Sequence, residues 1–303
     1  MTAPQIAWPT KSREFRNHHF DSTIWNQFEF RDDDIVIATY AKSGTTWMQQ
    51  IVAQLLFAGA EGLEVARMSP CLEHRVPPQP VKLAQVAAQT HRRFLKTHLA
   101  VDVLVFSPKA KYIHIDRDGR DVVWSMYNHH LNANDTWYDT LNNTPGLVGY
   151  RMEKPPSCVR EYFHAWLEKD GYPFWPFWPH VRSWWGVRHL PNVLSLHYAQ
   201  LKADMPGEIR RIAKFLDITI DERKWPAIVE HCSFDYMKSN ATKSLPFEGK
   251  FWDGGAQTFV HKGVNGRWRD ILTADEVKAY EERAERELGP ACARWLATGE
   301  LWS

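Results

Sequence analysis

The sequence lacks several features that mark specialised classes of protein. No segment approaches the roughly 18 consecutive apolar residues of a membrane-spanning helix. The N-terminal MTAPQIAWPTKSREF has no apolar core that could serve as a secretory signal. The formal net charge is only +1, so no bulk electrostatic attraction to nucleic acid or to an anionic membrane is expected. The sequence therefore predicts a cytoplasmic protein without a membrane span and without a nucleic-acid partner.

Cysteine is also scarce. The four cysteines are scattered, with no CxxC spacing: Cys71, Cys158, Cys232 and Cys292. This pattern favours reduced thiols over a disulfide framework or a zinc site. The sequence also offers no cluster of carboxylates that could hold a metal. We therefore expect a functional site without a metal ion.

The composition is that of a globular protein. Hydrophobic residues make up 44% of the 303 residues and charged residues 24%. Aromatic residues reach 13%, with 15 tryptophans, which suggests an apolar pocket in addition to a core. No linker, repeat or low-complexity tract divides the chain. We expect a single domain over residues 1–303.

Short β-branched or apolar runs alternate with helical patterns along the chain. The predicted strands are 35–40, 93–99, 111–115 and 193–198. The predicted helices include 45–57, 122–129, 159–169, 181–187, 207–216 and a final helix over 273–287. Residues 131–156, rich in Asn, Asp, Thr and Pro, are expected to be irregular. This alternation predicts an α/β fold with a central parallel sheet of about five strands, flanked by helices.

The connection after the first predicted strand has the features of an anion site. Small residues, Ser43 and Gly44 among them, join the strand to a helix that begins near Thr45. Backbone N–H groups at the start of a helix attract anions, and phosphate most naturally. Lys42 adds a mobile cation. The connection is not a Walker A loop, because GxxxxGK[ST] is absent. The alternative is an ordinary strand-to-helix turn, with Gly44 in the turn and threonines capping the helix.

Three further segments carry groups suited to chemistry. Lys96 and His98 end the second predicted strand. A histidine in a strand is usually a core residue, but its place near an anion loop favours a proton acceptor. A charged turn at 116–121 holds Arg117 and Arg120, of which we expect Arg120 to pair with neighbouring acids. The third segment, 259–268, is rich in glycine and basic residues.

Together these segments resemble the signature motifs of cytosolic-type sulfotransferases, which use 3′-phosphoadenosine 5′-phosphosulfate (PAPS) as sulfuryl donor. TYAKSGTTW at 39–47 is similar to TYPKSGTTW, and KTHLA at 96–100 to KTHLP. RDGRDVVWS at 117–125 is similar to RNPKDVAVS, and HKGVNGRW at 261–268 to the RKGxxGDW part of a glycine loop. The motifs occur in the family's order over about 34–270. The resemblance implies a P-loop-like nucleotide-binding architecture.

The resemblance also implies roles for particular residues. The 5′-phosphosulfate would be held by Lys42, Ser43, Gly44, Thr45 and Thr46. The 3′-phosphate would be held by Arg117, Ser125, His261, Lys262 and Gly263. The adenine would contact Trp47, Tyr198 and Phe234. His98 would act as the catalytic base, with Lys42 and Lys96 assisting the transfer and PAP (3′-phosphoadenosine 5′-phosphate) as product.

The sequence departs from the family pattern at several positions. Ala41 and Ala100 replace prolines, and Arg267 replaces an aspartate. His261 replaces an arginine, and histidine neither stays charged nor grips phosphate bidentately. Cofactor binding is therefore expected to be weaker or more dependent on pH. The family's dimer motif is present only in degraded form over 269–278, which leaves the oligomeric state open.

The acceptor is suggested only by an aromatic–proline segment at 172–179. Its prolines preclude a regular helix, so it is either a rigid patch on the core or a lid over an apolar pocket. An apolar hydroxyl acceptor is indicated: a phenol, an aliphatic or terpenoid alcohol, or a glycolipid. Two alternatives stay open. One is a nucleotide or small-molecule kinase, since phosphoryl transfer uses similar loops, and the other is a non-catalytic nucleotide-binding module.

Overall fold

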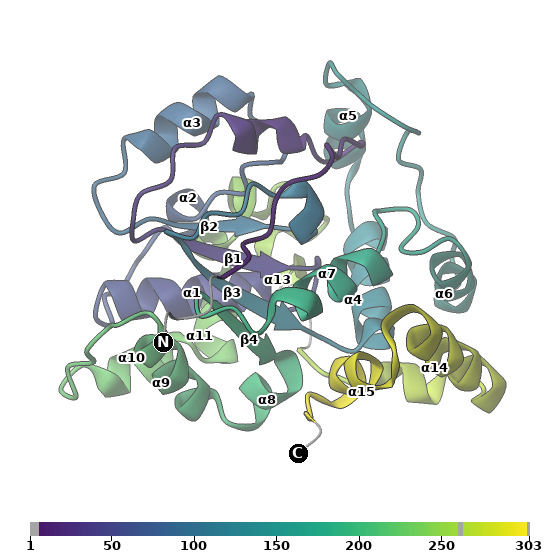
Figure 1. The fold of residues 1–303 in the computed structure, drawn as a ribbon. Coiled ribbons are helices and arrows are strands. Elements are labelled where there is room, and N and C mark those ends of the chain that lie inside the picture. The colour runs from purple at the N-terminus through teal and green to yellow at the C-terminus, as the bar shows by residue number, and fades with distance from the viewer. Residues whose placement is uncertain (1–5, 260–262, 302–303) are drawn as a thin grey trace.

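The computed structural model describes residues 6–259 and 263–301 of the chain. Its centre is a sheet of four parallel strands in the order β2-β1-β3-β4 (Figure 1). The strands are β1 (Ile35–Thr39), β2 (Phe94–Thr97), β3 (Lys111–Asp116) and β4 (Val193–His197). The predicted α/β class with a parallel sheet is confirmed. The sheet has four strands in the described ranges, where about five were predicted. The single domain over 1–303 stays a prediction.

The strands are buried because helices cover both faces of the sheet. All five residues of β1 are buried, which suits its β-branched sequence. Ile35 and Ile37 pack with α1, α9 and α10 on one face, while Val36 and Ala38 pack with η1, η2 and α7 on the other. In the first half of the chain the helices are η1 (Ser22–Asn26), α1 (Thr45–Leu56), α2 (Val65–Met68), α3 (Gln79–Ala87), η2 (Val101–Val103), α4 (Gly119–Leu131) and α5 (Asp135–Asn143).

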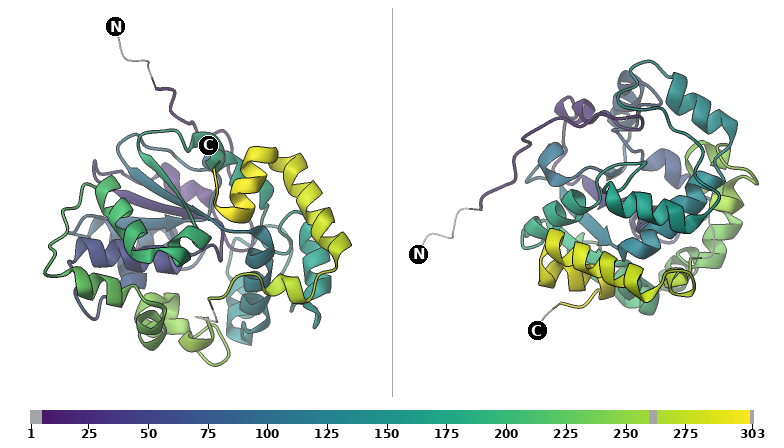
Figure 2. Two further views of the ribbon diagram at one scale, coloured as in Figure 1. Left: turned by 90° about the horizontal axis from the view of Figure 1, so that it is seen from below. Right: turned by 90° about the vertical axis from the view of Figure 1, so that its right-hand side faces the viewer.

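The second half of the chain is mainly helical. Its helices are α6 (Val159–Glu168), α7 (Trp178–Val187), α8 (Tyr198–Ala203), α9 (Met205–Phe215), α10 (Trp225–His231), α11 (Phe234–Ser239), α12 (Ala241–Ser244), η3 (Pro246–Gly249), α13 (Ala256–Phe259), η4 (Arg267–Asp270), α14 (Ala274–Leu288) and α15 (Pro290–Thr298). Figure 2 shows α14 and α15 side by side at the edge of the molecule. In the described ranges, no helix is both long and apolar enough to cross a bilayer.

Two of the helices in the structure, α5 and α15, were not predicted from the sequence. The segment 131–156 was expected to be irregular, yet it contains α5. The Asn134 side chain caps this helix, and Trp137 and Tyr138 bury its inner face. The predicted final helix is present as α14, with the Thr273 capping box, but α15 follows it. Proline at the first position of α15 suits a helix start, and it is the signal that the sequence analysis passed over.

The loops that leave β1, β2 and β3 meet at one edge of the sheet. Parallel strands in one register bring their carboxyl ends together, and Ala38 pairs with both Thr97 and His114. The anion loop, His98 and Arg117 follow directly after these strands. This edge is where ligands bind in open α/β sheets.

Candidate active site

The loop between β1 and α1 has the backbone shape of an anion cradle. Lys42 and Gly44 adopt positive φ angles of 66° and 114°. A Cβ at Gly44 would lie 3.0 Å from the Tyr198 ring and 3.3 Å from Ile115, so only glycine fits there. Among the described residues no side chain caps the N-terminus of α1. The unpaired first N–H groups of the helix therefore remain for a ligand, which fits the phosphosulfate predicted from the sequence.

Lys42 is a half-buried cation in this loop. Its Nζ lies 3.9 Å from the centroid of the Phe259 ring. Burial, with repulsion from Arg117 and Lys96, lowers the pKa of Lys42 to about 7. The free lysine therefore loses much of its charge near neutral pH, whereas a bound anion would favour the charged form.

His98 follows β2 and is held in one orientation. Its Nδ1 lies 2.9 Å from the Thr39 carbonyl oxygen. A carbonyl only accepts hydrogen bonds, so Nδ1 carries the hydrogen and Nε2 keeps its lone pair. The His98 backbone N–H donates to the Glu73 carboxylate at 2.6 Å. Burial, and secondarily Lys96, lowers the pKa of His98 to about 3, so the ring is neutral at physiological pH.

Thr39 links His98 to the anion loop. Its hydroxyl lies 2.6 Å from the Thr45 hydroxyl and 3.4 Å from His98 Nδ1. The sequence analysis did not identify Thr39 as a site residue, because its place at the end of a strand carries no chemical signature. Lys96, two residues before His98, is also buried, and burial lowers its pKa.

Arg117 is buried beside the anion loop. Its Nη1 donates to the Lys42 carbonyl at 2.9 Å, and its Nη2 donates to Asn265 Oδ1 at 2.8 Å. The guanidinium also stacks on the Tyr198 ring, 4.3 Å from its centroid. Arg120, by contrast, pairs with Asp118 at 2.8 Å, as predicted, although it is buried.

The residues predicted to hold adenine form a second group. Trp47 donates from Nε1 to the Cys232 carbonyl at 2.8 Å and lies edge-on to Tyr198, with 5.6 Å between centroids. Phe234 is exposed and would lie 3.1 Å from a Cβ at Gly263. The predicted site residues His261 and Lys262 lie outside the described residues. The proposed replacement of an arginine by His261 therefore stays a prediction.

One cavity of about 580 Å³ brings the predicted site residues together. Of the predicted residues that the structure describes, Ser43 is buried and does not line the cavity. The others do: Lys42, Gly44, Thr45, Thr46, Trp47, Lys96, His98, Arg117, Ser125, Tyr198, Phe234 and Gly263. The cavity is also lined by aromatic side chains and three further histidines: His19, His74, His129, Trp137, Phe174, Trp175, Phe247, Phe251, Trp252 and Phe259.

The aromatic–proline segment 172–179 divides between the cavity and the core. Trp175 lines the cavity, and its ring centroid lies 5.9 Å from that of His98. Trp178 instead begins α7 and is fully buried against Trp166 and Tyr280. Of the two alternatives for this segment, Trp175 therefore fits the lid over a pocket and Trp178 the patch on the core. The expectation that the prolines preclude a regular helix was wrong at Trp178, because Pro179 stands in the first turn of α7, where proline is tolerated.

Comparisons with known proteins identify the family of the chain. The family model of the sulfotransferase domain matches residues 32–290. The chain is 29% identical to a glycolipid sulfotransferase of Mycobacterium bovis (strain BCG / Pasteur 1173P2), over 94% of each chain. It is 32% identical to sulfotransferase 1B1 of Mus musculus, covering 84% of this chain and 82% of that one.

Two solved structures share the fold. Mouse sulfotransferase SULT7A1 complexed with PAP aligns with a TM-score of 0.67 at 23% identity, covering 90% of both chains. A retinol dehydratase in complex with retinol and PAP aligns with a TM-score of 0.68 at 25% identity, covering 88% of this chain and 84% of that one. The resemblance seen in the sequence is confirmed, and the chain belongs to the sulfotransferase domain family.

Proposed function

We propose that this protein transfers the sulfuryl group of PAPS to the hydroxyl of an apolar small molecule, with His98 as the base. The observation that carries the proposal is the placement of His98. The Thr39 carbonyl binds Nδ1 and leaves Nε2 for the cavity, beside the anion loop. A neutral imidazole with a free Nε2 is suited to accept the proton of an acceptor hydroxyl.

The other groups have complementary tasks. PAPS, when bound, supplies the sulfuryl group and leaves as PAP. Lys42 and the N–H groups of α1 would bind its 5′ phosphate end, where negative charge develops on the leaving oxygen. Arg117 and Ser125 would bind the 3′-phosphate. Trp47, Tyr198 and Phe234 would contact the adenine.

The acceptor is proposed from the aromatic lining of the cavity and from the relatives. The aromatic lining favours an acceptor with an apolar body, and the relatives include a glycolipid sulfotransferase.

A kinase is disfavoured by the family to which the chain belongs. We further propose that the protein acts in the cytoplasm and that turnover needs no metal. Incubation with labelled PAPS and a panel of phenols, aliphatic alcohols and glycolipids tests the proposal. PAPS binding without turnover on any acceptor would favour a non-catalytic binding module.

Lys42→Ala is expected to weaken PAP binding and to lower the rate, because this lysine would contact both the bound donor and the transition state. A charge-assisted hydrogen bond contributes roughly 1.5–3 kcal/mol. In the wild type, PAP affinity should also fall as the pH rises above about 7, where free Lys42 loses its proton. Calorimetry from pH 6 to 9 measures both effects. Lys109→Ala, which removes an exposed cation paired with Asp32, is the control. Equal PAP affinity in the two variants would contradict the role of Lys42.

Trp175→Ala and Trp178→Ala are expected to have opposite consequences. Trp175 lines the cavity, so its loss should raise the KM for the acceptor and leave PAP affinity unchanged. Trp178 is fully buried, so its loss should destabilise the fold by about 3–5 kcal/mol. Acceptor kinetics and thermal melting of both variants separate the two roles. An unaltered KM in the Trp175 variant would remove this side chain from the acceptor site.

A further inference from the structure

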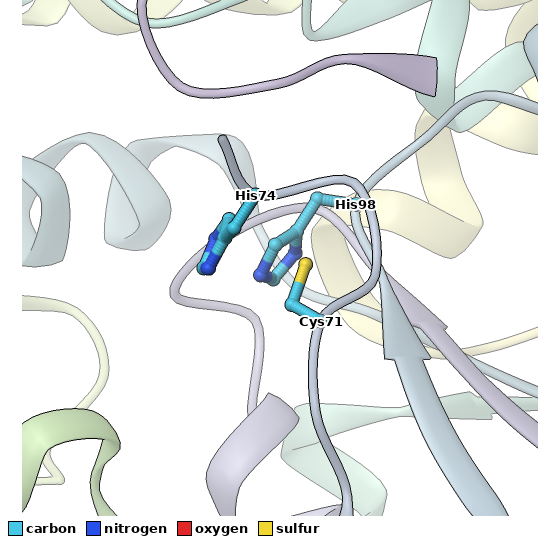
Figure 3. Close-up of side chains that lie close together, drawn as sticks. All are labelled: Cys71, His74 and His98. Carbon is cyan, nitrogen blue, oxygen red and sulfur yellow. The ribbon is translucent and has the colours of Figure 1, made fainter. Parts of the chain in front are cut away.

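Three potential metal ligands converge beside the cavity, at the C-terminal end of β2. Cys71 and His74 lie in the segment between α2 and α3, and His98 follows β2. Figure 3 shows the three side chains lying close together. Their ligand atoms all lie within 4.8 Å of one another. A backbone bridge between Cys71 and Lys96 holds the segment along β2, so the convergence is built into the fold.

We propose that this cluster binds a thiophilic divalent cation such as Zn²⁺, and that the ion inhibits the enzyme by occupying Nε2 of His98. Cysteine thiolates and histidine imidazoles are the usual zinc ligands in proteins, and three protein ligands leave a fourth position open. The claim that the ion inhibits the enzyme rests on the proposed role of His98 as base. The claim that the cluster binds the ion does not depend on that role.

His98 is arranged as a metal-binding histidine usually is, and His74 is held by ring stacking and by its backbone. A ligating imidazole donates its other ring N–H to a backbone carbonyl or a carboxylate, which fixes the ring. His98 already makes this bond to the Thr39 carbonyl and presents Nε2. His74 stacks on Phe20, with 5.5 Å between ring centroids and 4° between planes. Its own carbonyl accepts a hydrogen bond from the buried Lys82.

The surroundings supply compensating charge. The buried Glu73 carboxylate lies between the Cys71 and His98 segments and accepts from the His98 N–H at 2.6 Å. With the Cys71 thiolate it provides two negative charges, which balance the two positive charges of the ion, while the buried ammonium groups of Lys96 and Lys82 add positive charge nearby. Burial raises the pKa of the Cys71 thiol, so the free protein holds the proton. Metal binding forms the bond to sulfur and releases that proton to solvent.

The three ligand atoms need only a small movement to reach the spacing of a zinc site. Ligand atoms around tetrahedral zinc lie about 3.3–3.8 Å apart, so side-chain rotations must draw the three atoms in by roughly 1 Å. His74 and His98 line the cavity, whereas Cys71 does not. The fourth position on the ion would therefore face the cavity, open to water. An acceptor and the ion would compete for this space.

The test combines an optical and a kinetic measurement. Co²⁺ added to the metal-free protein should give a thiolate charge-transfer band and the intense visible bands of tetrahedral cobalt. Cys71→Ala should lose the charge-transfer band, while Cys292→Ala, which removes another buried thiol, should keep it. Zn²⁺ should inhibit turnover in competition with the acceptor. Cys71→Ala should raise the inhibitory concentration at least about tenfold and leave turnover without zinc unchanged.

The outcomes separate the site from the proposed function. A cobalt spectrum identical in wild type and Cys71→Ala would overturn the site, and so would an unchanged inhibitory concentration of zinc. A thiolate band without inhibition would support the site and contradict His98 as base. If Cys71→Ala fails to fold by thermal melting, Cys71→Ser and His74→Ala replace it. Either of these should weaken cobalt binding.

Discussion

His98→Gln is expected to lower kcat by ~10²–10⁴, the usual contribution of a general base. Glutamine keeps a polar side chain near the Thr39 carbonyl but has no nitrogen that can accept a proton. PAP affinity should change little, because the imidazole is held by the Thr39 carbonyl of β1, and the His98 backbone N–H by Glu73, rather than by the cofactor loop. Single-turnover rates with saturating PAPS and acceptor, together with PAP calorimetry, measure the two quantities separately.

His129→Gln provides a matched control for this experiment. His129 is another histidine at the cavity, and burial lowers its pKa well below the usual range. Within residues 6–259 and 263–301, its Nδ1 has no hydrogen-bond partner that would direct the other ring nitrogen toward the anion loop, so its loss should change the acceptor KM more than kcat. If both variants kept wild-type kcat, the base would have to be sought elsewhere. If both lost it equally, the effect would be one of packing.

Acidification is expected to remove most of the stability of the fold between about pH 6 and pH 4. Burial lowers the pKa of His18 to about 4, of His98 to about 3 and of His130 to about 4. In the unfolded chain a histidine takes up its proton near pH 6.5. Below that pH the unfolded state binds these three protons and the folded state does not. Stability is therefore complete above pH 6.5 and falls as the pH decreases toward 4.

The expected loss of stability follows from the linkage between protonation and unfolding. Each proton contributes about 1.4 kcal/mol per pH unit, so three contribute about 4 kcal/mol per pH unit. Two pH units then remove about 8 kcal/mol, which is comparable to the whole stability of a typical domain. Denaturant unfolding at a series of pH values measures the slope. His130→Gln should reduce this slope by the contribution of about one proton. His189→Gln, at an exposed position, should leave the slope unchanged. A slope near zero would show that the buried histidines titrate normally.

The sequence was most informative where function depends on consecutive residues. The anion loop, His98 and Arg117 each follow a strand, and parallel strands in register bring such residues to one edge. Sequence patterns could therefore place them together. They could not distinguish Trp175 from Trp178, because both are aromatic neighbours of proline. Only the packing of α7 decides which one reaches the cavity.

Contacts between distant segments could not be predicted from the sequence patterns. Cys71 and His74 lie in an irregular stretch with several prolines, which carries no periodicity and no ligand spacing. Their approach to His98 depends on the bridge between Cys71 and Lys96 and on the hydrogen bonds of Glu73 to Thr97 and His98. The contact of Asn265 with Arg117 joins residues 148 positions apart. Such contacts are fixed by the way the loops pack, and no local propensity encodes them.

The two hydrogen bonds of Thr39 have a consequence for how the two substrates would influence each other. Its hydroxyl bonds to Thr45 at the donor loop, while its carbonyl fixes the ring of His98. In the proposed reaction, Thr39 thus contacts both the loop that would bind the donor and the histidine that would act on the acceptor. Free-energy changes at residues that share a partner are not additive. If the loop binds the donor and His98 is the base, as proposed, we expect donor occupancy and the basicity of this imidazole to be coupled, so that the affinity for one substrate depends on the presence of the other.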